Sequence, residues 1–334
     1  MNPPPLLRLL LWPLSLLYAA AMWLRAWLYA RGWLTQRHLS STVISVGNLT
    51  VGGTGKTPMV IWLAEKFMAE GKRVAILSRG YRALGGNSDE IELMRNRLQD
   101  RVAFGVGKDR YAQGQRLASQ GIDVFLLDDG FQHLSLARDI DIVLVDSTRP
   151  LRKELILPAG RLREPRSALH RADLVVFTRT ELSELTVGAI QKFPQFAIYP
   201  STTKLLGLRR HGSPKDATSL RHSYEDPVFA FCGIGNPEGF WRDLERWGLH
   251  VVGRKSFRDH HRYTQPEVHK LVEAAHSVGA KALITTEKDA QNLDDKMLQA
   301  TLVYIALIAL ELPDEAQFLR DLRQRLGLRG GVAA

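Results

Sequence analysis

A glycine-rich loop near residue 50 contains the residue types that bind a phosphate chain. Residues 47–57 read Gly-Asn-Leu-Thr-Val-Gly-Gly-Thr-Gly-Lys-Thr, the Walker A pattern except that Thr50 stands where the first glycine is usual. The glycines let backbone N–H groups point at phosphate oxygens. Lys56 would place a positive charge against the β- and γ-phosphates, and the Thr57 hydroxyl could bind Mg²⁺. The residues expected to bind nucleotide are Thr50, Val51, Gly52, Gly53, Thr54, Gly55, Lys56 and Thr57.

The flanking segments favour phosphate binding over a glycine-rich turn with an incidental lysine. Residues 42–46 are β-branched and apolar, as in a buried parallel strand, and residues 59–68 have an amphipathic helical pattern. Strand, loop and helix in this order place an anion at a helix N-terminus, where the helix dipole attracts it. Residues 105–108 also join glycines to a lysine, but their spacing predicts an ordinary turn.

Two adjacent carboxylates, Asp128 and Asp129, follow a second apolar run at residues 124–127. A Walker B acid is expected at such a strand end, beside the phosphate loop. Adjacent carboxylates repel each other unless a cation neutralises them, so we interpret this pair as a site for Mg²⁺, bound directly or through water. The alternative is that the two acids cap the next element, since Gly130 permits a turn.

Further apolar runs predict an α/β fold with a parallel sheet. Strand-like runs occur at residues 74–77, 142–145 and 174–177, and helical stretches separate most of them. Such alternation is typical of a parallel sheet with helices on both faces. Ligands of these sheets bind at the carboxyl ends of the strands, where the sequence places residues 78–81, the Asp128–Asp129 pair and Asp146.

After about residue 195 the pattern changes to that of a smaller α/β domain. Residues 196–208 could form extended strands linking two lobes, and apolar runs at 228–231 and 282–284 predict strands of the second lobe. His260 and His261 are adjacent and do not share a face, so a metal-binding pair is not expected. A single histidine that transfers a proton or orients a carboxylate is the alternative.

Composition restricts the class of protein. The 334 residues include 45 Lys and Arg against 35 Asp and Glu, and the net charge of +10 indicates an anionic partner: nucleic acid, acidic lipid or a phosphorylated ligand. Hydrophobic residues at 45% and charged residues at 24% exclude wholesale disorder and a polytopic membrane protein. A single cysteine excludes an intrachain disulfide and fits a reducing compartment.

The N-terminal segment is apolar, basic and rich in tryptophan. Residues 9–24 carry no charge, four of the seven tryptophans lie in the first 33 residues, and the first carboxylate is Glu65. A helix from about Pro13 to Ala30 would be roughly 27 Å long, slightly short for a hydrocarbon core of ~30 Å, with Arg25 inside it. We favour a helix lying in the membrane interface over a spanning anchor, a secretory signal or a core helix.

A basic stretch at residues 149–171 contains seven Lys and Arg against two acids. Its three prolines prevent one continuous helix. The stretch is either a solvated loop or a cationic wall that binds a phosphorylated or anionic-lipid substrate through charge-assisted hydrogen bonds.

Seven stretches together resemble the tetraacyldisaccharide 4'-kinase family, the lipid A 4'-kinases. They follow the family's order across nearly the whole chain, at residues 45–58, 77–81, 88–90, 127–133, 157–165, 231–237 and 286–289. Thr50 in place of the first loop glycine is also a feature of this family. The resemblance implies transfer of the ATP γ-phosphate to the 4'-hydroxyl of a tetraacylated glucosamine disaccharide 1-phosphate in lipid A biosynthesis, which gives lipid IVA, with ATP and Mg²⁺ as cofactors.

The resemblance also implies roles for single residues. Asp89 would be the general base acting with His260, which the family's Asp-His motif favours over His261. Spacing alone would have assigned residues 88–90 to a solvated turn. The residues implied around Mg²⁺ are Thr57, Asp128, Asp129 and Glu164. The residues implied in phosphate or substrate binding are Arg79 and Arg110.

The implied architecture is a P-loop NTPase-like parallel sheet core with helices on both faces, a smaller C-terminal α/β lobe and an N-terminal membrane-associated helix. We place the helix at residues 1–38, the kinase core at 39–205 and the lobe, with its hinge strands, at 206–330. The implied location is the cytoplasmic face of the inner membrane of a Gram-negative bacterium. The expected partners are that lipid surface and the acylated disaccharide, with no nucleic acid and no obligate protein partner.

Two other classes of protein fit parts of the sequence. A P-loop ATPase or GTPase that moves or assembles membrane proteins would hydrolyse nucleotide without a sugar acceptor, but Asp89 and the basic stretch favour a kinase. A nucleic-acid-binding protein would fit the pI of 9.8. However, the basic residues cluster at the N-terminus and beside the phosphate loop, without an interleaved aromatic platform.

Overall fold

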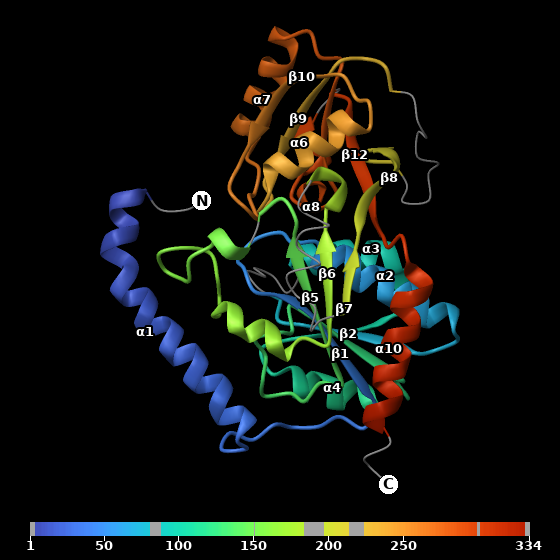
Figure 1. Ribbon diagram of the computed structural model, residues 1–334. Coiled ribbons are helices and arrows are strands. Elements are labelled where there is room, and N and C mark those ends of the chain that lie inside the picture. The colour runs from blue at the N-terminus through green and yellow to red at the C-terminus, as the bar shows by residue number, and fades with distance from the viewer. Residues whose placement is uncertain are drawn as a thin grey trace. The chain divides into compact units, whose positions relative to one another are not determined.

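The computed structural model describes residues 4–80, 88–149, 151–183, 197–213, 224–298 and 301–330 (Figure 1). The chain divides into two compact units. Unit 1 comprises residues 1–81, 100–202 and 311–334, and unit 2 comprises residues 82–99 and 203–310. We had expected each domain to be one continuous stretch of the sequence. In the structure, each unit is instead made of two or three stretches that are separated in the sequence. Tyr81 of the 77–81 motif, and residues 150 and 196, lie outside the described residues.

Unit 1 is built on a seven-stranded sheet in the order β3-β2-β4-β1-β5-β6-β7, and each neighbouring pair is parallel. The strands are β1 (Thr42–Asn48), β2 (Val74–Ser78), β3 (Ala103–Val106), β4 (Val124–Asp128), β5 (Ile140–Asp146), β6 (Leu174–Thr178) and β7 (Ala197–Pro200). The strands predicted from apolar runs are confirmed. The turn expected at residues 105–108 starts later, because Gly105 and Val106 end the edge strand β3.

The register of this sheet aligns the predicted nucleotide residues. Val46 of β1 is level with Asp128 of β4, so the glycine-rich loop and the paired acids leave the sheet at the same edge. Both strands are buried along almost their whole length, as expected for central strands covered on two faces. The helices of this unit are α1 (Pro5–Ala30), α2 (Lys56–Ala69), α4 (Arg110–Ala118), α10 (Glu315–Gly330) and the 3₁₀ helices at Leu151–Lys153, Arg166–Arg171 and Thr180–Leu182.

Unit 2 contains a five-stranded sheet in the order β10-β9-β11-β12-β8. Its elements are β8 (Thr202–Arg210), β9 (Val228–Cys232), β10 (Val251–Ser256), β11 (Ala282–Thr286), β12 (Val303–Glu311), α3 (Asp89–Leu98), α6 (Pro237–Arg246), α7 (Gln265–Ser277), α8 (Glu287–Ala290) and α9 (Asp295–Leu298), and a 3₁₀ helix at Gln99–Arg101 follows α3. Side chains of β9 alternate between two cores: Ala230 packs with Trp241 of α6, and Phe231 packs with Leu271 of α7. Helices therefore cover both faces of this sheet.

Helix α1 differs from its prediction in length. It begins at Pro5 and contains Pro13 in its interior, whereas we expected Pro13 in the first turn. The 26 residues span about 39 Å at ~1.5 Å per residue, so the helix is longer than a hydrocarbon core. Among the described residues it is the one helix long and apolar enough to cross a membrane, with a mean hydropathy of 1.5.

Polar contacts tie one face of α1 to unit 1. Ser15 Oγ donates to the carbonyl oxygen of Ile156 at 3.1 Å, and the Tyr18 hydroxyl donates to that of Arg163 at 3.0 Å. Arg25, which would lie inside the hydrocarbon core if this helix spanned a membrane, donates to the carbonyl oxygen of Gln132 at 3.0 Å. These three polar side chains thus contact protein.

Helix α10, the last element of the chain, packs on α2 through a buried aromatic ring. Phe318 is fully buried, and its ring centroid lies 5.6 Å from Trp62 and 5.0 Å from Tyr199. An ion pair between Lys66 and Glu315 at 2.6 Å joins the same two helices.

We expect Phe318→Ala to destabilise unit 1 by about 3–5 kcal/mol, because it leaves a cavity between the rings of Trp62 and Tyr199. Chemical unfolding followed by tryptophan fluorescence measures this loss. Gln324→Ala is the control, since Gln324 is exposed on the same helix. Equal stabilities of the two variants would contradict the packing described.

Candidate active site

The loop between β1 and α2 has the backbone shape of a phosphate cradle. Gly52 and Gly55 adopt φ angles of +107° and +88°, which side chains disfavour, and Gly55 is the N-cap residue of α2. Asn48 Nδ2 donates to Thr54 Oγ1 at 2.8 Å, and Thr178 Oγ1 donates to the carbonyl oxygen of Thr54 at 3.0 Å. Residues outside the loop therefore fix its conformation.

Part of the basic stretch is bonded along this loop. The Val51 N–H donates to the carbonyl oxygen of Arg161 at 2.8 Å, and the Arg163 N–H donates to that of Leu49 at 2.7 Å. The Arg161 guanidinium also donates to the carbonyl oxygen of Val51 at 2.6 Å. We call residues 156–163 the strap, because they also accept the hydrogen bonds of Ser15 and Tyr18 from α1.

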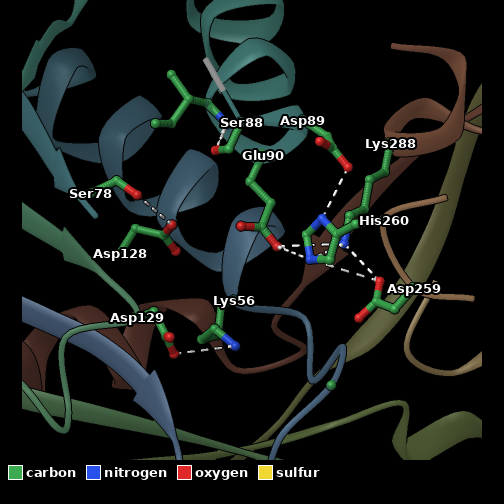
Figure 2. Close-up of polar contacts among 12 residues, drawn as sticks. Lys56, Ser78, Ser88, Asp89, Glu90, Asp128, Asp129, Asp259, His260 and Lys288 are labelled. Carbon is green, nitrogen blue, oxygen red and sulfur yellow. Dashed lines mark hydrogen bonds and ion pairs between the residues drawn. The ribbon is translucent and has the colours of Figure 1, made fainter. Parts of the chain in front are cut away.

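Asp128 and Asp129 lie in different environments although they are adjacent. Asp128 is buried at the end of β4 and accepts a hydrogen bond from Ser78 Oγ at 3.3 Å (Figure 2). Asp129 has a φ of +52° and forms ion pairs with Lys56 Nζ at 3.4 Å and Arg163 Nη1 at 2.7 Å. Burial would raise the pKa of Asp129, but these two cations outweigh burial and hold it below its usual range. Side chains thus compensate the charge of Asp129.

The other predicted metal and phosphate residues are also placed in unit 1. Glu164 is buried and accepts hydrogen bonds from Arg171 at 2.7 Å and from Gln132 at 3.0 Å. Arg110 is buried at the start of α4 and donates to the carbonyl oxygen of Asp129 at 3.1 Å. Arg79 is exposed just after β2.

The donor set of unit 1 fits a magnesium ion bound together with phosphates. The Thr57 hydroxyl and the Asp128 carboxylate offer oxygen atoms, which Mg²⁺ prefers. In the described parts of the chain, no three His, Cys, Asp or Glu side chains cluster as ligands. Mg²⁺ in kinases commonly takes one or two protein oxygens and completes its shell with phosphates and water, so this donor set is sufficient.

The third group of predicted residues lies in unit 2. Asp89 is the first residue of α3, which Ser88 caps by accepting from the Ile91 N–H at 3.4 Å. His260 follows β10, has a φ of +60°, and places Nδ1 3.0 Å from Asp89 Oδ2 (Figure 2). Asn292 Nδ2 donates to the same Asp89 oxygen at 3.2 Å. The structure therefore brings Asp89 and His260 together.

The neighbouring histidine has a different surrounding. His261 Nε2 lies 3.1 Å from Glu267 Oε2, and its ring stacks on Phe257 with centroids 4.6 Å apart. Glu267 also forms the capping box at the start of α7. His261 therefore contacts the residue that caps the start of α7.

Burial and hydrogen bonding act in opposite directions on Asp89. Burial would raise the pKa of its carboxyl group. The hydrogen bond from His260 and, more weakly, the ammonium of Lys288 outweigh burial and lower this pKa below its ordinary value. Asp89 is consequently a carboxylate at neutral pH.

Two stretches that carry the family resemblance, residues 231–237 and 286–289, hold the loop that contains His260. Asp289 Oδ1 accepts from the Gly233 N–H at 2.7 Å and from the Tyr263 hydroxyl at 2.8 Å. The Gly233 carbonyl oxygen accepts from the His260 N–H at 3.1 Å. A Cβ on Gly233 would lie 2.9 Å from the Arg258 carbonyl oxygen, which explains the glycine.

Sequence reasoning missed several side chains that contact the site residues. These are Gln132, Arg163, Lys288 and Asn292. Each lies in or next to a stretch that carries the family resemblance, but their partners are far away in the sequence, so spacing gave no signal.

Comparison with known proteins decides the family. The family model "Tetraacyldisaccharide-1-P 4'-kinase" matches residues 7–327, almost the whole chain. The chain belongs to the tetraacyldisaccharide 4'-kinase family. It is therefore an ATP-dependent kinase of the lipid A pathway, as the resemblance predicted, rather than a nucleotide-hydrolysing switch or a nucleic-acid-binding protein.

Individual members of the family are similar over most of their length. The tetraacyldisaccharide 4'-kinase of Geobacter metallireducens is 41% identical over 323 residues, which cover 90% of this chain and 93% of that protein. The Desulfotalea psychrophila enzyme is 38% identical over 311 residues, covering 85% and 87%. The crystal structure of LpxK from Aquifex aeolicus in complex with ATP has a TM-score of 0.74 at 30% identity and covers 96% of this chain and 99% of that one.

We expect Lys56→Met to weaken ATP binding roughly 10- to 100-fold, because a hydrogen bond to a charged group contributes about 1.5–3 kcal/mol. Asp129 keeps its partner Arg163, so the fold should persist. Calorimetric titration with ATP measures the affinity. Lys66→Met is the control on the same helix, and equal ATP affinities of the two variants would exclude Lys56 from the phosphate site.

Proposed function

We propose that this kinase transfers the γ-phosphate of ATP to the 4'-hydroxyl of a tetraacylated glucosamine disaccharide 1-phosphate, with Asp89 as general base. The observation that carries the assignment is the 3.0 Å contact between His260 Nδ1 and an ionised Asp89. A sugar hydroxyl is a poor nucleophile, so its proton must be accepted as the new bond forms.

The two oxygen atoms of the Asp89 carboxylate have different roles in the proposed reaction. Oδ2 is engaged by His260 and Asn292, and we assign the proton of the acceptor to Oδ1. The hydroxyl oxygen then bonds to the γ-phosphorus, the bond from that phosphorus to the β-phosphate oxygen breaks, and ADP leaves. The proton stays on Asp89 until solvent removes it.

Unit 1 would hold the nucleotide in this reaction. The backbone N–H groups of the loop and the Lys56 ammonium would bind the β- and γ-phosphates. Thr57 and Asp128 would hold Mg²⁺, which supplies positive charge against the phosphates when bound. Asp129 and Glu164 would contact this ion through water, since arginines occupy both carboxylates. Arg79 and Arg110 would bind phosphate or substrate oxygens.

Substitution of the base tests the assignment. We expect Asp89→Asn to lower kcat by about 10²–10⁴, the usual contribution of a positioned proton acceptor, while ATP affinity stays unchanged. Mass measurement of the lipid after incubation with ATP and Mg²⁺ gives the turnover. Asp100→Asn is the control, because Asp100 is exposed just beyond α3. Near-normal turnover of Asp89→Asn would remove Asp89 from the role of base.

We also propose that α1 lies in the interface of the cytoplasmic face of the inner membrane, where an acylated substrate resides. Leu6, Leu10 and Leu17 recur at spacings of four and seven and are exposed, which gives an apolar stripe. Ser15, Tyr18 and Arg25 form hydrogen bonds with protein over nearly three turns of the helix. A spanning helix could not keep these contacts and also be surrounded by lipid, so interfacial binding is favoured.

The membrane proposal predicts an effect of polar substitutions on this stripe. We expect the triple variant Leu6→Gln, Leu10→Gln, Leu17→Gln to lower the affinity for vesicles with anionic lipid at least tenfold. Burying each exposed leucine side chain in lipid stabilises the bound state by about 1.5–3 kcal/mol. Flotation of the protein with vesicles measures binding. Val278→Gln, an exposed apolar residue in unit 2, is the control, and unchanged flotation of the triple variant would contradict the proposal.

A further inference from the structure

A lysine contacts the side of His260 that faces away from Asp89. Lys288, in the short helix α8, places Nζ 3.2 Å from His260 Nε2 (Figure 2). The lysine side chain is largely buried, with 17% of its surface exposed. None of the chemistry proposed above uses this contact.

The two neighbours of the ring determine which nitrogen carries the proton. The ionised carboxylate of Asp89 can only accept a hydrogen bond, so Nδ1 must donate to it. An ammonium group can only donate, so Nε2 must accept from Lys288. These requirements describe a neutral imidazole with its proton on Nδ1.

Lys288 keeps its charge in this position. Burial would lower the pKa of Lys288, but the carboxylates of Glu90 and Asp259 outweigh burial and raise it. Asp259 Oδ1 lies 2.9 Å from Nζ, and Glu90 Oε1 lies 3.6 Å from it. The ammonium is therefore the stable form.

The same two acids also lie near the ring of His260. Glu90 Oε1 is 3.9 Å and Asp259 Oδ1 is 4.0 Å from Nε2, both farther away than Lys288 Nζ. Because Lys288 forms ion pairs with both, their negative charge is compensated before it acts on the ring. The charged groups around His260 are thus Asp89, Glu90, Asp259 and Lys288.

We propose that Lys288 is a positioning residue that fixes His260 as the neutral Nδ1–H tautomer, so that the ring donates to Asp89 and takes up no proton itself. The inference rests on the proposed function, in which Asp89 is the base. It assigns His260 the task of orienting Asp89 and excludes it as a relay that carries the acceptor's proton onward. Lys288 acts through His260 and needs no contact with the substrate.

Nitrogen NMR of ring-labelled histidine tests the tautomer directly, with His260→Gln used to assign the signal. In the wild-type protein we expect the His260 pattern of a protonated Nδ1 and an unprotonated Nε2. In Lys288→Met we expect a shift of His260 toward the imidazolium pattern, because the donor to Nε2 is gone while Glu90 and Asp259 still lie near that nitrogen. Lys288→Arg, which keeps a donor, should restore the wild-type pattern, and Lys281→Met is the exposed control.

Kinetics give a second readout. We expect Lys288→Met to lower kcat roughly 10- to 100-fold with KM for ATP unchanged, while Lys288→Arg recovers most of this loss. Lys288 also lowers the pKa of Asp89, so its removal raises that pKa. The acid limb of the plot of kcat against pH should therefore move to higher pH. A purely structural role would move neither the tautomer nor this limb.

Failure of this inference differs from failure of the proposed function. A wild-type His260 with Nε2 protonated overturns the role of Lys288 even if Lys288→Met does not fold. An unchanged tautomer and kcat in Lys288→Met overturn it too, and a loss of turnover in Asp89→Asn would then leave the proposed base intact. Full turnover of Asp89→Asn instead overturns the proposed base, whatever the tautomer of His260.

Discussion

The hydrogen bond between His260 Nδ1 and Asp89 Oδ2 is the contact on which the proposed chemistry of this kinase depends. A partly buried carboxyl group would otherwise hold its proton more tightly and be unable to accept another one at the right moment. The surrounding elements position both residues. Ser88 caps α3 so that Asp89 is its first residue, and Asp289 binds Gly233, which in turn accepts a hydrogen bond from the His260 N–H.

In unit 1, a continuous set of backbone contacts holds the glycine-rich loop that we propose binds the nucleotide. The strap pairs with the glycine-rich loop, and Arg163 extends from the strap to Asp129. Helix α1 is bonded to the same strap through Ser15 and Tyr18. Helix α1 and the glycine-rich loop are thus connected through one short segment. The arginines of this segment form ion pairs with acidic side chains of the same chain. The basic pattern alone predicted only a solvated loop or a cationic wall for an anionic substrate.

Local patterns predicted the parts of the fold whose causes are local. The apolar run of β1, the glycines and the start of α2 are adjacent in sequence, so their order alone predicted the loop. Asp89 had no such signal, because its partner His260 lies 171 residues away and only the family resemblance indicated it. Lys288 and Arg163 were missed for the same reason.

Helix α1 shows where local rules gave a wrong boundary. The preference of proline for a first helical turn predicted a start near Pro13, but Pro5 already occupies the first turn and the helix continues through Pro13. The apolar stretch around Arg25 gave no sign of its partner, the carbonyl oxygen of Gln132, which lies 107 residues away in the sequence. Tertiary contacts of this kind decide a side chain's surroundings and are absent from a hydropathy pattern.

The most direct test of the account measures ATP consumption by the wild-type protein with and without the acylated disaccharide, together with the mass of the lipid. A kinase with a dedicated proton acceptor should consume ATP only when the lipid is present and add one phosphate to the lipid for each ATP used. Equal ATP consumption without the lipid, or a lipid of unchanged mass, would contradict the central claim that Asp89 serves a sugar hydroxyl.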